Sequence, residues 1–341
     1  MRSPMSPPRC CAIITALWLA AVGLATAQTA PAQLALVPAQ QVAHATQATM
    51  LASTRAGARI VAVGDRGVVL LSDDGGKSFR QAKAVPVDAT LTAVSFADER
   101  QGWAVGHWGV VLHSADGGET WALQRSDVKN DRPLFALRFF DAKRGVAVGL
   151  WSLVLVTEDG GGTWATVTMP VPEAAKKADL NLLGLFTDAK GRLYATAERG
   201  MVLRSDDQGR TWAYLPTGYK GSFWSGLATR DGALLVAGLR GSLYRSSDEG
   251  RSWARIDTQS KSSITALVQA GVDVVGVGLD GLLLRSRDGG ASFKLEVRAD
   301  RVSLTTVTID AQGQPVLFSR QGVVAPPESK PAEAKPTDPK Q

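Results

Sequence analysis

The eight-residue motif Ser114-Ala115-Asp116-Gly117-Gly118-Glu119-Thr120-Trp121 occurs six times along the chain with small changes, and this repetition predicts the fold. The shared pattern is Ser/Thr-x-Asp-x-Gly-x-Ser/Thr-Phe/Trp. Its aspartates are separated by 42, 43, 48, 41 and 40 residues and are Asp74, Asp116, Asp159, Asp207, Asp248 and Asp288. A fixed period of about 40 residues indicates one supersecondary unit that is repeated, so the whole fold follows from a single unit.

Each copy of the motif has the composition of a hairpin loop. A short β-rich run precedes the hydroxyl residue, as in Val110-Val111-Leu112, and a second short strand begins at the aromatic residue. Asp and Ser side chains hydrogen-bond backbone amides within turns, and Gly supplies positive φ. The motif resembles the Asp-box, or BNR, repeat of sialidases and related propellers, where it links the third and fourth strands of a blade.

The acidic composition of the motif also suggests a calcium-binding site, and calcium needs six to eight oxygen ligands. Only one aspartate recurs in each copy, and no glutamate follows at a fixed distance. We therefore interpret the six aspartates as structural turn residues and predict no metal site.

The second repeat shows the full unit most clearly. Leu91–Phe96 alternates like a strand, Gly102–Gly106 forms the next, and Val110–Ser114 and Trp121–Gln124 flank the box. Four short antiparallel strands in about 40 residues are typical of a β-propeller blade. Three further strands without a box follow the sixth copy, at residues 304–309, 316–319 and 322–325.

These segments predict an all-β fold, a seven-bladed propeller of four-stranded antiparallel blades. The last blade lacks an outer strand. We expect residues 33–37, Gln-Leu-Ala-Leu-Val, to supply it, because pairing the two chain ends removes an exposed sheet edge.

Composition divides the chain into three parts. Residues 1–27 contain Arg2 and Arg9, an apolar stretch and Ala25-Thr26-Ala27, the pattern of a cleaved signal peptide. Residues 28–325 hold the propeller. Residues 326–341 alternate Pro, Lys, Glu and Ala and predict a disordered tail.

Export to a bacterial periplasm is the localisation expected from these features. Cleavage would remove both cysteines, Cys10 and Cys11, and leave a chain without disulfides, which the periplasm permits. No membrane span is expected after cleavage, because the apolar run is short. The formal net charge of +6 would fall to +4 on loss of two arginines, a balance that does not indicate nucleic-acid binding.

The amino-acid sequences of the repeats differ in the turns between the second and third strands. A tight turn favours Asn or Asp at its middle position, whereas large side chains stand there or beside it. Together with Trp224 in a connection between blades, they form the predicted partner-binding set: Arg66, Trp108, Trp151, Arg199, Arg240, Arg320 and Trp224. Arg and Trp are enriched at interface hot spots. The alternative is that these residues are solvated turn tips and rings packed between blades.

A glycosidase is the main alternative function. Sialidases need an arginine triad, a Tyr nucleophile with a Glu partner and an Asp acid/base, and other glycosidases use two carboxylates. Arg66, Arg199 and Arg240 could imitate the triad. The four tyrosines, however, suggest no Tyr/Glu pair, and the three histidines match no compact zinc spacing. We therefore predict a non-enzymatic protein without a cofactor, with a sialidase-like or carbohydrate-binding propeller as the alternative.

A second resemblance covers nearly all of residues 33–325. Phe96-Ala97-Asp98-Glu99-Arg100-Gln101-Gly102-Trp103-Ala104-Val105-Gly106, echoed at residues 140–149, looks like the repeat of the photosystem II stability/assembly factor family. That resemblance implies a seven-bladed scaffold that binds membrane protein subunits through an arginine patch. Exported relatives in proteobacteria imply a link with resistance-nodulation-division (RND) type transporters. We expect a monomeric periplasmic accessory factor that binds a membrane protein complex or its periplasmic domains.

Overall fold

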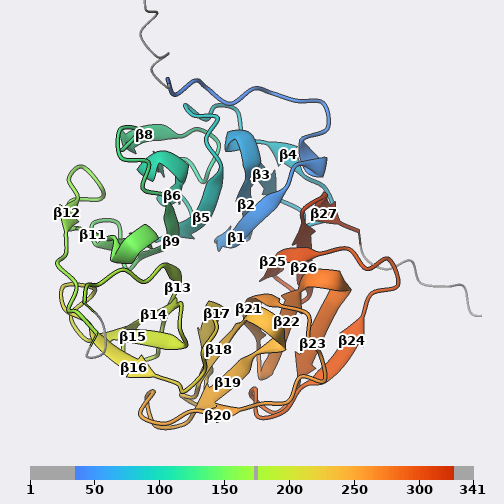
Figure 1. Ribbon diagram of the computed structural model, residues 1–341. Helices are drawn as coiled ribbons and strands as arrows, with labels where there is room; N and C mark the ends of the chain where they lie inside the picture. Colours follow the sequence, from blue (N-terminus) through green and yellow to red (C-terminus); the bar gives the residue numbers. More distant parts are fainter. Residues whose placement is uncertain (1–34, 173–175, 326–341) are drawn as a thin grey trace, which may run out of the picture. The chain divides into compact units, whose positions relative to one another are not determined.

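Seven antiparallel sheets follow one another along the chain and stand around a ring in the computed structural model (Figure 1). The structure describes residues 35–172 and 176–325, and Leu36 begins the compact unit that holds the sheets. Six sheets have four strands and the seventh has three. The predicted seven-bladed propeller is therefore confirmed. The predicted signal segment, residues 1–27, and the predicted tail, residues 326–341, lie outside the described residues.

The strands of each blade are consecutive in sequence, with the first strand nearest the centre of the ring (Figure 1). The first strands are β1 (Met50–Ala56), β5 (Leu91–Phe96), β9 (Leu134–Phe139), β13 (Leu182–Thr187), β17 (Phe223–Ala228), β21 (Ile264–Ala270) and β25 (Leu304–Ile309). The second strands are β2 (Arg59–Gly64), β6 (Gly102–Gly106), β10 (Gly145–Gly149), β14 (Leu193–Ala197), β18 (Leu234–Gly238), β22 (Asp273–Gly278) and β26 (Pro315–Ser319).

The outer half of each blade is shorter and more irregular. The third strands are β3 (Val69–Ser72), β7 (Val111–Ser114), β11 (Val154–Thr157), β15 (Met201–Ser205), β19 (Leu243–Ser246), β23 (Leu282–Ser286) and β27 (Gly322–Val324). The fourth strands are β4 (Arg80–Gln81), β8 (Ala122–Arg125), β12 (Ala165–Thr166), β16 (Ala213–Pro216), β20 (Ala254–Arg255) and β24 (Lys294–Val297).

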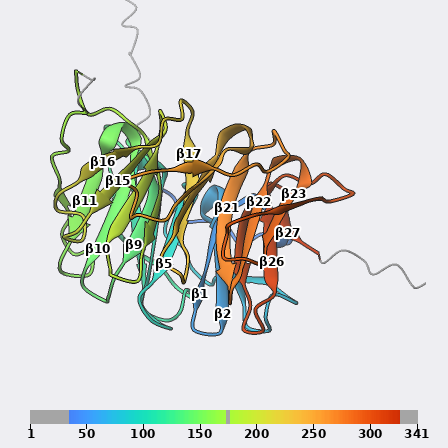
Figure 2. The same cartoon turned by 90° about the horizontal axis from the view of Figure 1, so that it is seen from below.

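The antiparallel register places two kinds of loop at opposite ends of the blades, which Figure 2 shows from the side. In the first blade Gly64, at the end of β2, pairs with Met50 at the start of β1, whereas Ser72 of the box pairs with Ile60. The boxes therefore share one end with the turns between first and second strands. We call this end the box face.

The opposite end, the turn face, carries the turns between second and third strands. Five of these turns are short 3-10 helices: η2 (Asp65–Gly67), η3 (His107–Gly109), η4 (Leu150–Ser152), η5 (Leu239–Gly241) and η6 (Leu279–Gly281). The fourth and seventh blades have ordinary turns there, at residues 198–200 and 320–322.

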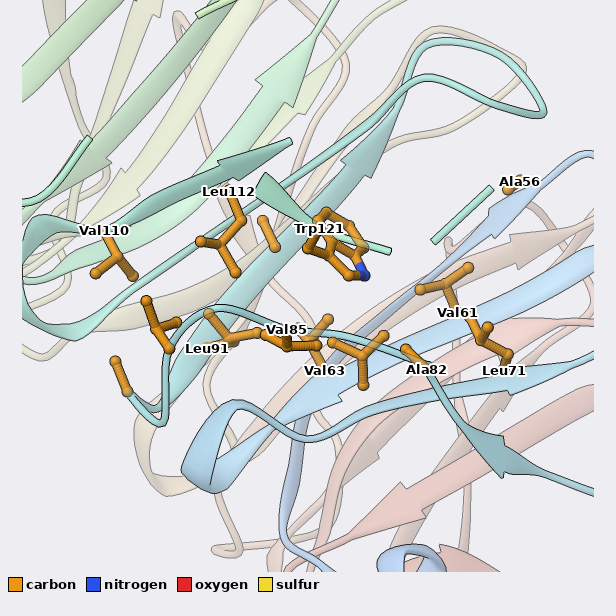
Figure 3. Packing of buried hydrophobic residues seen from close by; sticks show 14 residues of the cluster. Ala56, Val61, Val63, Leu71, Ala82, Val85, Leu91, Val110, Leu112 and Trp121 are labelled. Atoms are coloured by element: carbon orange, nitrogen blue, oxygen red, sulfur yellow. The ribbon is translucent and has the colours of Figure 1, made fainter. Parts of the chain in front are cut away.

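The core lies between neighbouring blades, and a box aromatic helps to fill it. Trp121 is 6% exposed and packs in one cluster with Val61, Leu71 and Ala82 of the first blade (Figure 3). Its indole Nε1 donates a hydrogen bond to the carbonyl of Gly118, 2.9 Å away, within its own box. Burying a side chain of this size stabilises the fold by about 2–3 kcal/mol, so each box also fastens one blade to the next.

The predicted closure by an N-terminal strand is not borne out. The seventh sheet has three strands, β25, β26 and β27, and the described part of the 33–37 segment belongs to no strand. Leu36 packs instead against the cluster of the first two blades. The chain then reaches η1 (Ala45–Gln47), which contacts β27 and β4 before β1 begins. The ends of the propeller thus meet through packing and isolated hydrogen bonds rather than through a shared sheet.

Candidate functional site

The turn face is built by one hydrogen bond that recurs from blade to blade. The N–H of the first turn residue donates to the carbonyl that precedes the first strand of its own blade. Examples are Asp65 to Thr49 at 3.0 Å and Leu239 to Ser222 at 3.0 Å. A Cβ on Gly64, the residue before the first of these turns, would lie 1.9 Å from the Thr49 oxygen. This close approach explains why glycine ends so many of the second strands.

The middle residues of the turns adopt a left-handed backbone although they are large. Their φ values are 54°, 56°, 53°, 56° and 55° for Arg66, Trp108, Trp151, Arg199 and Arg240, and Asp280 has 57°. For an L-residue this conformation costs about 1–2 kcal/mol, and Asp or Asn tolerates it better than Arg or Trp. The side chains at these positions are therefore not explained by the turn that carries them.

Most of the predicted partner-binding residues are exposed on this face. Trp151 is 63% exposed, and Arg66, Arg199, Arg240 and Arg320 are also exposed. Arg199 lies 3.6 Å from Asp179. Within residues 35–172 and 176–325, the other three guanidinium groups make no ion pair within 4.0 Å.

Hydrogen bonds hold neighbouring turn tips in a common frame. The side-chain oxygen of Asn181 accepts the N–H of Trp151 at 3.0 Å, and its side-chain nitrogen donates to Glu198 at 3.0 Å. Glu198 directly precedes Arg199, so the tips of the third and fourth blades are tied together. The N–H of Arg240 similarly donates to the hydroxyl of Ser263 in the next blade, at 3.2 Å.

Two of the predicted tryptophans, Trp108 and Trp224, are less exposed than Trp151. Trp108 is half-buried and packs against the core cluster of the first two blades. Trp224 is half-buried in β17, a first strand, rather than in a loop between blades. Both rings therefore combine packing with partial exposure, whereas Trp151 is mainly exposed.

The aspartates of the boxes use their carboxylates inside the turn. Asp74 Oδ1 accepts the Ser72 hydroxyl and the Ser78 N–H, and Oδ2 accepts the Ser78 hydroxyl. The hydrogen bond from the Ser78 hydroxyl, then that from its N–H, lower the pKa of Asp74 to about 2. Among the described residues no group of three or more His, Cys, Asp or Glu side chains could hold a metal ion.

Three of the four tyrosine hydroxyls make hydrogen bonds within the fold. Tyr194 is fully buried and donates to Asp188 at 3.4 Å, and burial raises its pKa to about 12. The hydroxyls of Tyr214 and Tyr219 donate to the carbonyls of Pro170 and Leu239, each at 3.0 Å. A tyrosine nucleophile would need a free hydroxyl beside a basic carboxylate, an arrangement unlike these three.

A cavity that sequence reasoning missed lies beside Arg66. It measures about 770 Å³, and its wall includes His44, Gln47 and Asp88. These residues precede the first repeat or lie in a connection between blades, so aligning the repeats does not bring them together. Only the path of the N-terminal segment over the first blade does so.

Comparison with known proteins agrees with the propeller fold. Residues 81–213 match the family model described as Photosynthesis system II assembly factor YCF48. A structure described as YCF48 bound to D1 peptide is 20% identical, with a TM-score of 0.68 over 84% of this chain and 94% of that one. YCF48 from Cyanidioschyzon merolae is 18% identical, with a TM-score of 0.65 over 83% and 96% of the two chains.

A more distant structure, that of U3-55K, is 9% identical and has a TM-score of 0.62 over 80% of this chain and 89% of that one. No curated protein matches the chain. Within the described ranges, none of the helices has the length and apolar character of a membrane span. Residues 81–213 thus match the model of the photosystem II assembly factor family, and the chain has a seven-bladed propeller fold that the solved YCF48 structures share.

Proposed function

We propose that this chain is a non-enzymatic scaffold or accessory factor that binds a membrane protein complex through its turn face. The observation that carries the proposal is the strained, exposed set of large side chains at aligned turn tips. Trp151 combines a left-handed backbone with 63% exposure, so it stabilises neither the turn nor the core. Strained backbone that persists in this way is typical of functional sites.

The charges on the face indicate the kind of partner. Arg66, Arg240 and Arg320 are exposed arginines free of ion pairs within the described residues, and Arg199 forms one ion pair, with Asp179 at 3.6 Å. A planar guanidinium binds carboxylates through paired hydrogen bonds. The partner we propose therefore presents acidic groups together with an apolar surface for Trp151. The similar structure of YCF48 bound to D1 peptide supports a protein segment as the ligand class.

Location and partner identity are further parts of the proposal. The composition of residues 1–27 favours export to a periplasm, where the propeller would meet periplasmic domains of a membrane complex. An RND-type transporter is the partner that we propose, and the propeller would bind it as a monomer. Fractionation of cells that express the full chain or a chain without residues 2–27 tests export. Equal recovery of both forms in the cytoplasm would contradict it.

Affinity capture from solubilised membranes tests the binding face. We expect the Arg66→Ala, Arg199→Ala, Arg240→Ala triple variant to recover the partner at least tenfold less than wild type, because charged hot-spot residues each contribute more than about 1 kcal/mol. The matched control replaces Arg230, Arg251 and Arg287, three exposed arginines on the box face, and loses the same charge. Equal loss in both triple variants would indicate a net-charge effect, and full recovery by the first would exclude the turn face.

Hydrolysis assays test the non-enzymatic part of the proposal. Fluorogenic sialosides and other glycosides should show no turnover above the rate without protein. Turnover that is lost on substitution of Arg66, Arg199 or Arg240 would contradict the scaffold function and favour the glycosidase alternative.

A further inference from the structure

The cavity beside Arg66 is formed because the N-terminal segment crosses the first blade without joining its sheet. We call residues 37–49 the strap. The strap is fixed by the N–H of Ala39, which donates to the Val85 carbonyl at 3.0 Å, and by Gln41 Nε2, which donates to the Ala82 carbonyl at 2.7 Å. Between these bonds and η1, the strap and the first blade line a half-open cavity of about 770 Å³.

The wall of this cavity is apolar over much of its area. Val37 and Val42 of the strap are each 47% exposed, and the buried Val68 lies opposite on the first blade. Pro38, Ala43 and Ala48 extend the same wall. When a ligand covers such exposed aliphatic side chains, the complex is stabilised by about 25 cal/mol for each Å² of apolar surface buried.

One arginine and two aspartates, Arg66, Asp65 and Asp88, line the same cavity. Arg66 has no carboxylate within 4.0 Å among the described residues, and Asp88 does not pair with it. The Oδ1 atom of Asp88 is buried and has no hydrogen-bond partner in the described part of the chain. A buried acceptor without a partner is unfavourable by about 1–3 kcal/mol, and a ligand donor recovers this free energy only where the carboxylate turns toward the cavity.

We propose that this cavity is a specificity pocket for an extended peptide segment that carries an aliphatic side chain next to an acidic residue. The aliphatic group lies against Val37, Val42 and Val68, a backbone N–H of the segment donates to Asp88, and the acidic group accepts from Arg66. The volume falls within the range of about 300–1,000 Å³ that is usual for ligand pockets.

The proposal rests on the proposed function and deepens it, because Arg66 belongs to both surfaces. Arg66 stands at the tip of η2 on the turn face and also forms part of the cavity wall. A protein segment that crosses the turn face therefore reaches the cavity directly. An extended peptide fits this set of charges, since an acidic side chain can accept from Arg66 while backbone N–H groups donate to Asp65 and Asp88.

Selection from a displayed library of random heptapeptides tests the pocket with a defined probe. Wild type should enrich peptides with an aliphatic residue next to Asp or Glu. Ala43→Trp places an indole inside the cavity from an exposed strap position and should lower the affinity of the enriched peptides at least tenfold. Asp88→Asn should lower it about threefold, because it replaces one of the two acceptor oxygens with an amide donor.

The matched control is Ala58→Trp, which adds the same ring at an exposed position in the β1–β2 turn on the box face. It should leave peptide affinity unchanged, and circular dichroism melts verify that all variants fold. Enrichment that is unchanged by Ala43→Trp and Asp88→Asn overturns the pocket. If the arginine triple variant still loses the peptides, only the pocket has failed. If that variant also retains them, the proposed binding face has failed as well.

Discussion

Trp151 has a backbone conformation that lowers stability and a ring that is exposed to solvent. Its φ of 53° is unfavourable for a large side chain, and its ring is 63% exposed. The left-handed backbone costs about 1–2 kcal/mol, and little burial offsets it. Asp280 holds the same position in the sixth blade with a short polar side chain and a hydrogen bond from the Ser262 hydroxyl at 2.8 Å. The two residues share a conformation but differ in what they present to solvent.

The substitution Trp151→Asn should therefore leave the free energy of unfolding unchanged or raise it by up to about 1 kcal/mol, because Asn tolerates the left-handed region. Capture of the membrane partner should fall several-fold in the same variant, since an aromatic anchor is lost. Urea unfolding and affinity capture measure the two effects. Asp280→Asn is the control and should change neither. A loss of more than about 1 kcal/mol of stability in Trp151→Asn would show that the indole is structural.

The box is the element that makes one blade like the next. Its aspartate accepts hydrogen bonds from two hydroxyls and a backbone N–H, and in three boxes the tryptophan that follows donates a hydrogen bond to the same loop, as Trp253 Nε1 does to the Gly250 carbonyl at 3.1 Å. Every partner lies within five residues in sequence. The loop can therefore form without help from the rest of the chain, which suits a unit repeated in different surroundings.

This arrangement predicts a pH dependence. The hydrogen bond from the Ser252 hydroxyl, followed by the Ser252 N–H and the Ser246 hydroxyl, lowers the pKa of Asp248 from 3.8 to about 2. A lowered folded-state pKa stabilises the fold above pH 3.8, and that contribution disappears as the pH falls toward 2. Asp248→Asn should lower the melting temperature at pH 7, and its difference from wild type should narrow between pH 4 and pH 2. A difference that stays constant with pH would contradict this assignment.

Sequence reasoning succeeded where the determinants are local. The box spacing, the alternation of Leu91–Phe96 and the three strand segments after the sixth box were sufficient to predict seven blades, because each strand and turn follows from neighbouring residues. It failed for the predicted strand at residues 33–37, since the described part, residues 35–37, belongs to no strand although the apolar alternation fits one. The strap follows another path because Gln41 and Gln81 hold it by side-chain hydrogen bonds. Nor does sequence distinguish the half-buried Trp108 from the exposed Trp151, since their turns read alike and only packing separates them.

The whole molecule depends on a seam between its first and last blades that no covalent connection crosses. The Thr305 hydroxyl donates to the Met50 carbonyl, and the hydroxyls of Ser53 and Thr306 lie 3.1 Å apart. Phe79 and Phe318 meet edge to face, with ring centroids 5.5 Å apart. Elsewhere consecutive blades are joined by the chain itself, so loss of packing at this seam alone can separate two neighbouring blades.

Phe318→Ala tests this difference against Phe139→Ala, which removes the same buried ring at the seam between the second and third blades, where it stacks on Trp103. Both substitutions should lower the free energy of unfolding by about 3–5 kcal/mol, the usual result of deleting a buried phenylalanine. Only Phe318→Ala should open the ring before global unfolding, because chain connectivity still holds the second and third blades together. Native-state hydrogen exchange should therefore show faster exchange confined to β1 and β25 in that variant. Equal protection of these strands in both variants would mean that the seam opens only when the whole ring unfolds.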